Sequence, residues 1–201
     1  AELRWLTGDW TGGLAAGEAA SVLADETGQA GTSALARAQL TRILAGRGHE
    51  SGCRSLAAAA HQSVQTTGAR SLVIYLHSSL GLLELSLGRH EAALGELAIA
   101  DDAARSGDLR SHTVVPFLPD LIEAAVSVDR RDLAERAFER LLELDPAGFL
   151  RTRAAVARCR GLLEQDHGAA IEHLSAAIEL EDRAGVPFEA ARSRLLLGER
   201  L

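Results

Sequence analysis

The chain has 201 residues, a formal net charge of -7 and 47% hydrophobic residues, while only 3% of its residues are aromatic. Ala, Leu, Glu and Arg dominate, and because these residues form helices readily, the composition predicts an all-α protein. The acidic charge argues against direct contact with nucleic acid or an anionic membrane, since both attractions depend on surplus cations. No apolar run reaches the roughly 18 residues of a membrane-spanning helix and no signal peptide is present, so we expect a cytoplasmic protein.

The two cysteines and the absence of methionine allow further expectations about thiol chemistry and the extent of the chain. Cys53 and Cys159 are far apart and neither belongs to a C-x-x-C pair, so we expect two buried thiols without a disulfide or a zinc site. The sequence contains no Met, and we interpret it as a piece excised from a longer protein. We expect no cofactor in this piece.

Ten helices are predicted in two alternating sets. Second helices of a pair are predicted near 10–28, 49–67, 89–106, 131–144 and 167–184, and first helices near 30–46, 69–87, 117–129, 148–164 and 187–201. Pro119 and Pro187 mark helix starts, Gly88 and Gly185 mark helix ends, and Pro146 is predicted to end the fourth second helix.

A repeat of about 40 residues relates these pairs. Each second helix carries three small or apolar residues, four and three positions apart, which would share one buried face. The trios are Gly13, Gly17 and Ala20; Gly52, Leu56 and Ala59; Ala93, Leu97 and Ala100; Ala134, Phe138 and Leu141; and Ala170, Leu174 and Ala177. A period of this length is typical of one helix pair per repeat.

The third pair resembles a tetratricopeptide repeat through Leu80-Gly81, the turn residue Gly88, His90 and the small residue Ala93. The other pairs depart from the family pattern and their period is longer. The resemblance implies a tetratricopeptide-like α-solenoid of about five helix pairs in a right-handed superhelix, with 1–201 forming a single fragment. We expect it to be truncated at both ends, because "AELRWLTGDW" looks like the tail of a first helix and "LLLGERL" like a first helix without its partner.

Two longer segments resemble the helical sensor region of large LuxR-type (MalT-like) transcriptional regulators, which are common in actinobacteria. The segments are "RSHTVVPFLPDLIEAAVSVDRRDLAERAFERL" (110–141) and "ARCRGLLEQDHGAAIEHLSAAIELEDRAGVPFEAARSRLLLGERL" (157–201). The resemblance implies an ATP-binding module before this region and a helix-turn-helix after it, both outside the present chain.

Motifs for catalysis are missing from the sequence. There is no G-x-x-x-x-G-K-[ST] loop and no G-x-S-x-G elbow, and "TGDWTGG" occupies a helix-helix turn. His167 and His173 are six residues apart, whereas helical metal pairs use spacings of three or four, so no metal site is predicted. The carboxylates of "DDAARSGD" and "ELED" are interpreted as solvated faces. We therefore expect a non-enzyme.

The inner face of the first helices is the predicted binding surface, with Tyr75 as its anchor, since a tyrosine combines rigid area with a polar tip. Packing of Tyr75 between repeats is the alternative. The predicted surface comprises Tyr75, Ser78, Ser79, Leu82, Ser86, Arg37, Thr41, Asp120, Glu123 and Arg192.

These observations predict a non-catalytic sensor domain of a LuxR-type regulator that holds a protein partner or a small-molecule effector in its concave groove. The alternative is a stand-alone tetratricopeptide scaffold or adaptor that binds partner proteins. An all-helical enzyme is a third, weaker interpretation. Self-association is expected, because an uncapped solenoid exposes apolar surface.

Overall fold

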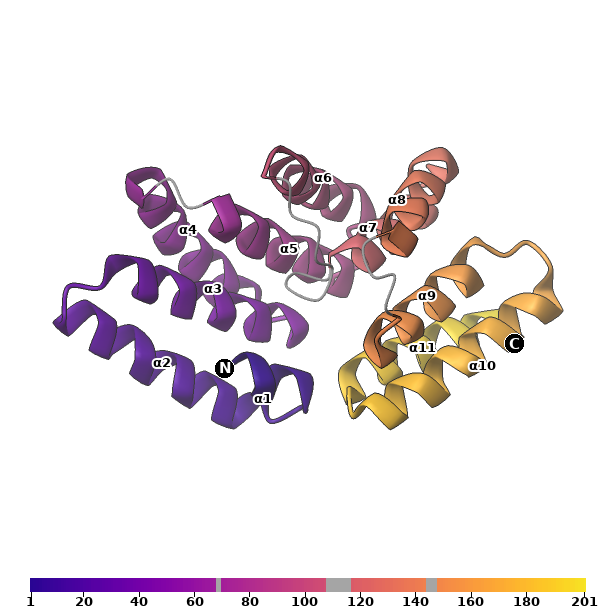
Figure 1. Ribbon diagram of the computed structural model, residues 1–201, viewed down its shortest axis with the longest axis horizontal. Helices are drawn as coiled ribbons and strands as arrows, with labels where there is room; N and C mark the ends of the chain where they lie inside the picture. Colours follow the sequence, from indigo (N-terminus) through magenta and orange to yellow (C-terminus); the bar gives the residue numbers. More distant parts are fainter. Residues whose placement is uncertain (68–69, 108–116, 144–147) are drawn as a thin grey trace. The chain divides into compact units, whose positions relative to one another are not determined.

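The computed structural model describes residues 1–67, 70–107, 117–143 and 148–201, and within these ranges every regular element is an α-helix (Figure 1). The all-α prediction is confirmed for this part of the chain. None of the described helices combines the length and apolar character needed to cross a membrane. The helices are α1 (Glu2–Leu6), α2 (Trp10–Glu26), α3 (Ala30–Gly46), α4 (Glu50–Thr67), α5 (Arg70–Ser86), α6 (His90–Ser106), α7 (Leu118–Ser127), α8 (Arg131–Glu143), α9 (Leu150–Leu163), α10 (His167–Ala184) and α11 (Pro187–Arg200).

The ten predicted helices are all present, and their ends differ from the predicted ends by at most two residues. Proline begins α7 and α11 as expected, because Pro119 and Pro187 lie in the first turn, where a missing N–H leaves no hydrogen bond unmade. The predicted helix stop at Pro146 lies outside the described residues.

The chain divides into two compact units, which are described separately. The first unit consists of Ala1–Trp5 and Asp9–Leu109, and the second of Leu6–Gly8 and Arg110–Leu201. A single continuous solenoid therefore stays a prediction, as do its handedness and the tetratricopeptide character of the repeats.

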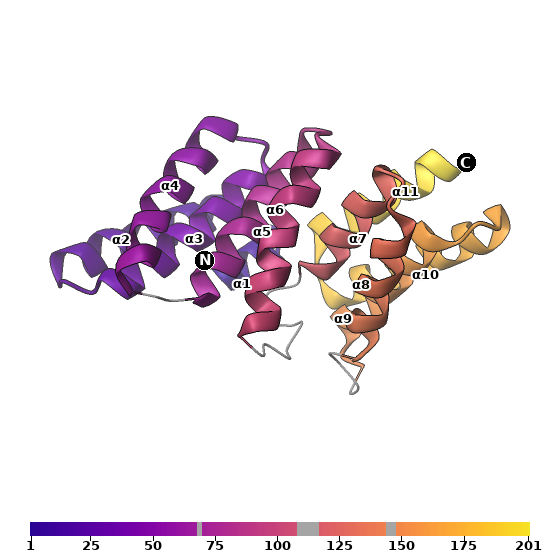
Figure 2. The same cartoon turned by 90° about the horizontal axis from the view of Figure 1, so that it is seen from above.

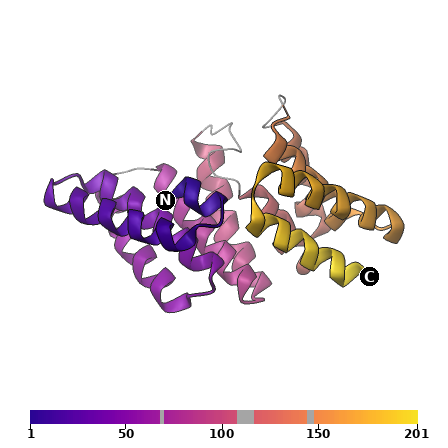
Figure 3. The ribbon, with the colours of Figure 1, turned by 90° about the horizontal axis from the view of Figure 1, so that it is seen from below.

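Both units use the same order of packing. In the first unit α3 packs against α4, α5 against α6, and α3 also contacts α5. In the second unit α7 packs against α8, α9 against α10, and α7 contacts α9 (Figure 2). The last helix, α11, lies along α10 after the turn at Gly185 (Figure 3). A first helix thus contacts both its own second helix and the next first helix.

One type of turn ends five of the helices. A residue with positive φ follows the last helical turn, and the N–H of the next residue donates to the carbonyl five positions back, at 2.7 to 3.2 Å. This arrangement satisfies carbonyls that the helix end leaves without partners, and it favours glycine because no Cβ opposes the left-handed conformation. The positive-φ residues are Gly28, Gly48, Gly88, Asp129 and Gly185.

The buried faces of the second helices correct three predicted trios. Both Ala93, Leu97, Ala100 and Ala170, Leu174, Ala177 are buried as predicted. In α4 the predicted register is wrong by one residue, because Cys53, Ala57 and Ala60 are the buried set. In α2 the third buried residue is Ser21 and not the predicted Ala20, and in α8 Ala137 is buried more deeply than the predicted Phe138. If Cys53, and not Gly52, is taken as the first residue of the α4 trio, the five trios begin at residues 13, 53, 93, 134 and 170. The first three of these positions are evenly spaced.

Close approach within a helix pair depends on glycine at Gly81 and Gly161. A Cβ added at Gly81 would lie 2.4 Å from Cγ of Leu97, so only glycine leaves room for this leucine. The same contact recurs in the second unit, where a Cβ on Gly161 would lie 2.6 Å from Cγ of Leu174. In both pairs a glycine of the first helix receives the central leucine of the second helix.

Candidate binding site

The predicted surface on α3 and α5 is mostly closed. Thr41, Ser78, Ser79 and Leu82 are buried, so the expectation that they are accessible is wrong. The hydroxyl groups donate to their own helices, from Ser78 Oγ to the Ile74 carbonyl at 2.5 Å and from Thr41 Oγ1 to the Arg37 carbonyl at 2.8 Å. Small hydroxyl side chains that face a packed neighbour can form their hydrogen bond with a carbonyl of their own helix.

Three predicted residues of the first unit keep some exposure. Tyr75 is partly buried and packs against the apolar cluster of α3, α4 and α5, and burial raises the pKa of its phenol. Ser86 is exposed, with its hydroxyl bonded to the Leu82 carbonyl at 2.9 Å. Arg37 forms an ion pair with Asp25 at 2.7 Å. The interactions described for these three side chains are with different partners, and binding by Tyr75 stays a prediction.

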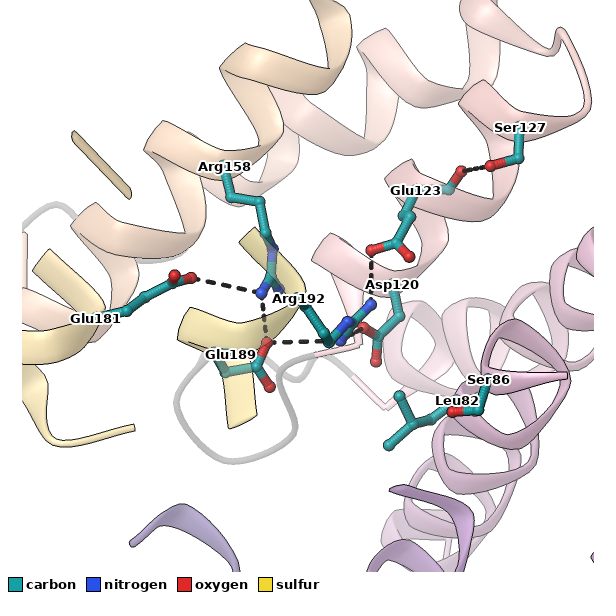
Figure 4. A network of polar contacts seen from close by, with 9 residues as sticks. All are labelled: Leu82, Ser86, Asp120, Glu123, Ser127, Arg158, Glu181, Glu189 and Arg192. Carbon is teal, nitrogen blue, oxygen red and sulfur yellow. Dashed lines mark hydrogen bonds and ion pairs between the residues drawn. The ribbon is translucent and has the colours of Figure 1, made fainter. Parts of the chain in front are cut away.

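The three predicted residues of the second unit do meet. Arg192 of α11 donates to Asp120 Oδ1 at 2.7 Å and to Glu123 Oε2 at 2.6 Å, and both carboxylates come from α7 (Figure 4). Asp120 is buried, while Arg192 and Glu123 keep 13% and 18% of their side-chain surface. One guanidinium group therefore connects two first helices that are not consecutive in the chain.

Three further members of this network are not predicted from the sequence. Arg158 of α9 is buried and pairs with Glu189 of α11 and, at 3.4 Å, with Glu181 of α10 (Figure 4). Glu181 belongs to the run interpreted as a solvated face, and that interpretation is wrong for this residue, which is 2% exposed. Its position offered a signal, because it lies four residues after the buried Ala177 and so shares its helix face.

The network holds more negative than positive charge. Four carboxylates face two guanidinium groups, which leaves a formal charge of -2. Burial alone would lower the pKa of Arg192, but the carboxylates of Glu123 and Asp120 raise it well above its ordinary value. Burial raises the pKa of Glu181, and Arg158 offsets only part of this effect. Oδ2 of Asp120 is buried and has no hydrogen-bond partner among the described residues.

A second ion network, in the first unit, is balanced by comparison. Arg54 and Arg89 each pair with Glu50 and with the buried Glu84, so two cations face two carboxylates. This network ties α4 to the turn between α5 and α6. Of these two networks, the α7–α9–α11 network is the one whose described residues carry surplus negative charge, so it is the stronger candidate for receiving a cationic group from a ligand or partner.

The remaining ionisable groups give no metal centre in the described part of the chain, where no cluster of three or more His, Cys, Asp or Glu residues could hold a metal ion. His173 lines a cavity between α8, α9 and α10, whereas His167 is exposed at the start of α10. The structure thus places these two residues in different surroundings.

Both cysteines are expected to resist thiol reagents in the folded protein. Cys53 and Cys159 are fully buried, and burial raises the pKa of each thiol to about 12. At about pH 8 the thiolate fraction is then about 10⁻⁴, and the thiolate is the reacting form. With Ellman's reagent we expect both thiols to react at least about 100-fold more slowly in buffer than in concentrated guanidinium chloride. Rapid reaction of either thiol in buffer would contradict its burial.

No protein-family model matches this chain, and no curated protein matches it.

Proposed function

We propose that this chain is a non-catalytic binding module, the tetratricopeptide-like sensor region of a LuxR-type transcriptional regulator. The α7–α9–α11 network carries the proposal, because charged residues of three first helices converge on the face where the repeat pattern predicts a concave groove. The Asp120 oxygen that has no hydrogen-bond partner among the described residues, and the surplus of carboxylates over guanidinium groups there, suit a protein partner or an effector that presents a cationic group. The module would act in the cytoplasm, without touching nucleic acid itself, and would self-associate.

In the proposed mechanism a ligand competes with Arg192 for Asp120 and Glu123. Release of Arg192 removes the ion pairs that join α7 to α11, so the helices gain a second arrangement. A ligand shifts the balance between two arrangements only by its difference in affinity for them. The flanking ATP-binding and DNA-binding modules would respond to that shift.

The proposal is tested in the full-length regulator with a reporter gene under its own promoter. Replacing Arg192 by Gln is expected to change the ratio of induced to basal expression by about fivefold or more, because coupling between sites is typically worth this much. Arg194→Gln is the matched control, since Arg194 lies on the same helix and forms an exposed pair with Asp182 at 2.7 Å. Equal behaviour of the two variants would contradict the proposal.

The reading frame around the chain separates the two candidate functions. An ATP-binding loop upstream together with a helix-turn-helix downstream is the expected result for a regulator. A frame that encodes only further repeats, or none, would contradict this assignment and favour the scaffold or adaptor.

A further inference from the structure

A trough with both apolar and polar walls lies between α8, α9 and α10 of the second unit. One cavity of about 410 Å³ is lined by Leu141 and Leu142 of α8, Val156 of α9 and Leu180 of α10, among others. A second cavity of about 560 Å³ is lined by Phe138, Leu163 and Gln165. Arg160 and His173 line both, so the two cavities adjoin. Leu142 is 44% exposed, so the described residues leave this side chain largely uncovered.

The trough follows the whole of α9. Its lining begins at Gly148, before the helix, and continues to Gln165, after its end. Since α9 has 14 residues, the trough is about 20 Å long. An α-helix of about four turns has this length.

Two cations stand along the trough without partners. Arg153 and Arg160 are exposed on α9 and line the first cavity, and the side chain of neither forms an ion pair or hydrogen bond with any described residue. They are seven residues apart, so they share one face of α9 at a separation of about 10 Å along its axis. Arg131, by contrast, is already engaged, donating to Glu135 at 2.9 Å and to the Leu163 carbonyl at 2.5 Å.

We propose that this trough docks an acidic amphipathic α-helix of a partner protein. Leucines on one face of the partner helix would pack on the apolar surface formed by Val156, Leu142 and Leu180. Two carboxylates seven residues apart would meet Arg153 and Arg160, because that spacing is also two helical turns. Charge complementarity favours this partner over a basic helix, because the described lining of the two cavities holds three arginines and one carboxylate, that of Glu164.

The inference extends the proposed binding function to a specific partner chemistry on another set of residues. The trough shares no lining residue with the Asp120–Arg192 network. Failure of helix docking would therefore leave the Arg192→Gln reporter result unaffected, and the two proposals fail separately.

The test uses the whole 201-residue chain and two synthetic helical peptides of about four turns. The first carries two Glu residues seven positions apart that bracket leucines on the same face, and the second has Arg in place of both Glu residues. Binding is measured by fluorescence anisotropy. We expect the acidic peptide to bind the unmodified chain and to lose about tenfold in affinity for the Arg153→Glu, Arg160→Glu double variant. The basic peptide should prefer that double variant.

Arg183→Glu provides the matched control, because Arg183 is exposed on α10, has no ion pair among the described residues and lines neither cavity. It should change the affinity by less than about twofold. Equal affinity of the acidic peptide for the chain and the double variant would overturn the proposal. So would a dimer of the chain that dissociates in the double variant without peptide, since a second copy would then occupy the trough.

Discussion

Replacing Arg158 by Ala is expected to lower the free energy of unfolding by about 3 to 5 kcal/mol, the cost of leaving a buried charge without its partner. The Arg158 side chain is 3% exposed and pairs with Glu181, which is 2% exposed, and with Glu189. Its removal leaves the Glu181 carboxylate without the one cation that pairs with it among the described residues. Urea unfolding followed by circular dichroism measures the change.

The loss in Arg158→Ala should depend on pH. Burial already raises the pKa of Glu181 above its ordinary value of 4.5, and Arg158 is the largest influence that lowers it, so its removal raises this pKa further. A carboxyl group whose folded pKa exceeds its unfolded pKa stabilises the fold below the unfolded value and loses that contribution as the pH rises through the folded value. The penalty should therefore be largest at neutral pH and shrink as the pH falls toward about 4.5.

A double variant distinguishes the effect of losing the Arg158 charge from the effect of losing the packing of its side chain. Arg158→Met with Glu181→Gln removes both charges and keeps most of the side-chain volume, so it should recover most of the stability. Arg194→Ala, which breaks an exposed pair with Asp182, should cost less than about 1 kcal/mol. If Arg158→Ala proves no more costly than Arg194→Ala, or if its penalty does not change with pH, the buried network does not act as described.

Local signals made the helices predictable from the sequence. The turn glycines Gly88 and Gly185 and the first-turn prolines Pro119 and Pro187 act within a few residues, so their effects can be read without knowing the tertiary structure. The Gly81 contact was also predictable, because a small residue opposite a leucine in a helix pair has a direct steric meaning. Where a trio of small residues was ambiguous, as in alanine-rich α4, the register was predicted one residue out.

The candidate site was less predictable because it depends on which face of each helix is buried. The sequence predicts Asp120, Glu123 and Arg192 to line an open groove, whereas they meet in ion pairs. No sequence pattern singles out Arg158, since a charged residue on a helix is usually solvated. Arg158 can be buried because two other helices, α10 and α11, each contribute a carboxylate that pairs with it, and no local sequence pattern predicts this pairing.

Replacing Gly81 by Ala is expected to destabilise the first unit by about 1 to 2 kcal/mol, although alanine is the better helix former. The new Cβ would lie 2.4 Å from Cγ and 2.7 Å from Cδ2 of Leu97, whose side chain is fully buried and has little room to move. Gly95→Ala is the matched control, because Gly95 is exposed in α6 and nothing lies within 4 Å of an added Cβ. That control should gain about 0.5 to 1 kcal/mol from helix propensity alone.

A double-mutant cycle tests whether the loss of stability in Gly81→Ala comes from the contact with Leu97. In a Leu97→Ala background the clash disappears, so Gly81→Ala should become stabilising by about the same amount as Gly95→Ala. Urea unfolding of the four proteins of the cycle gives the coupling energy between positions 81 and 97. If Gly81→Ala stabilises the chain even when Leu97 is present, then α5 and α6 are farther apart than the glycine contact requires, and the close approach that defines this helix pair is absent in solution.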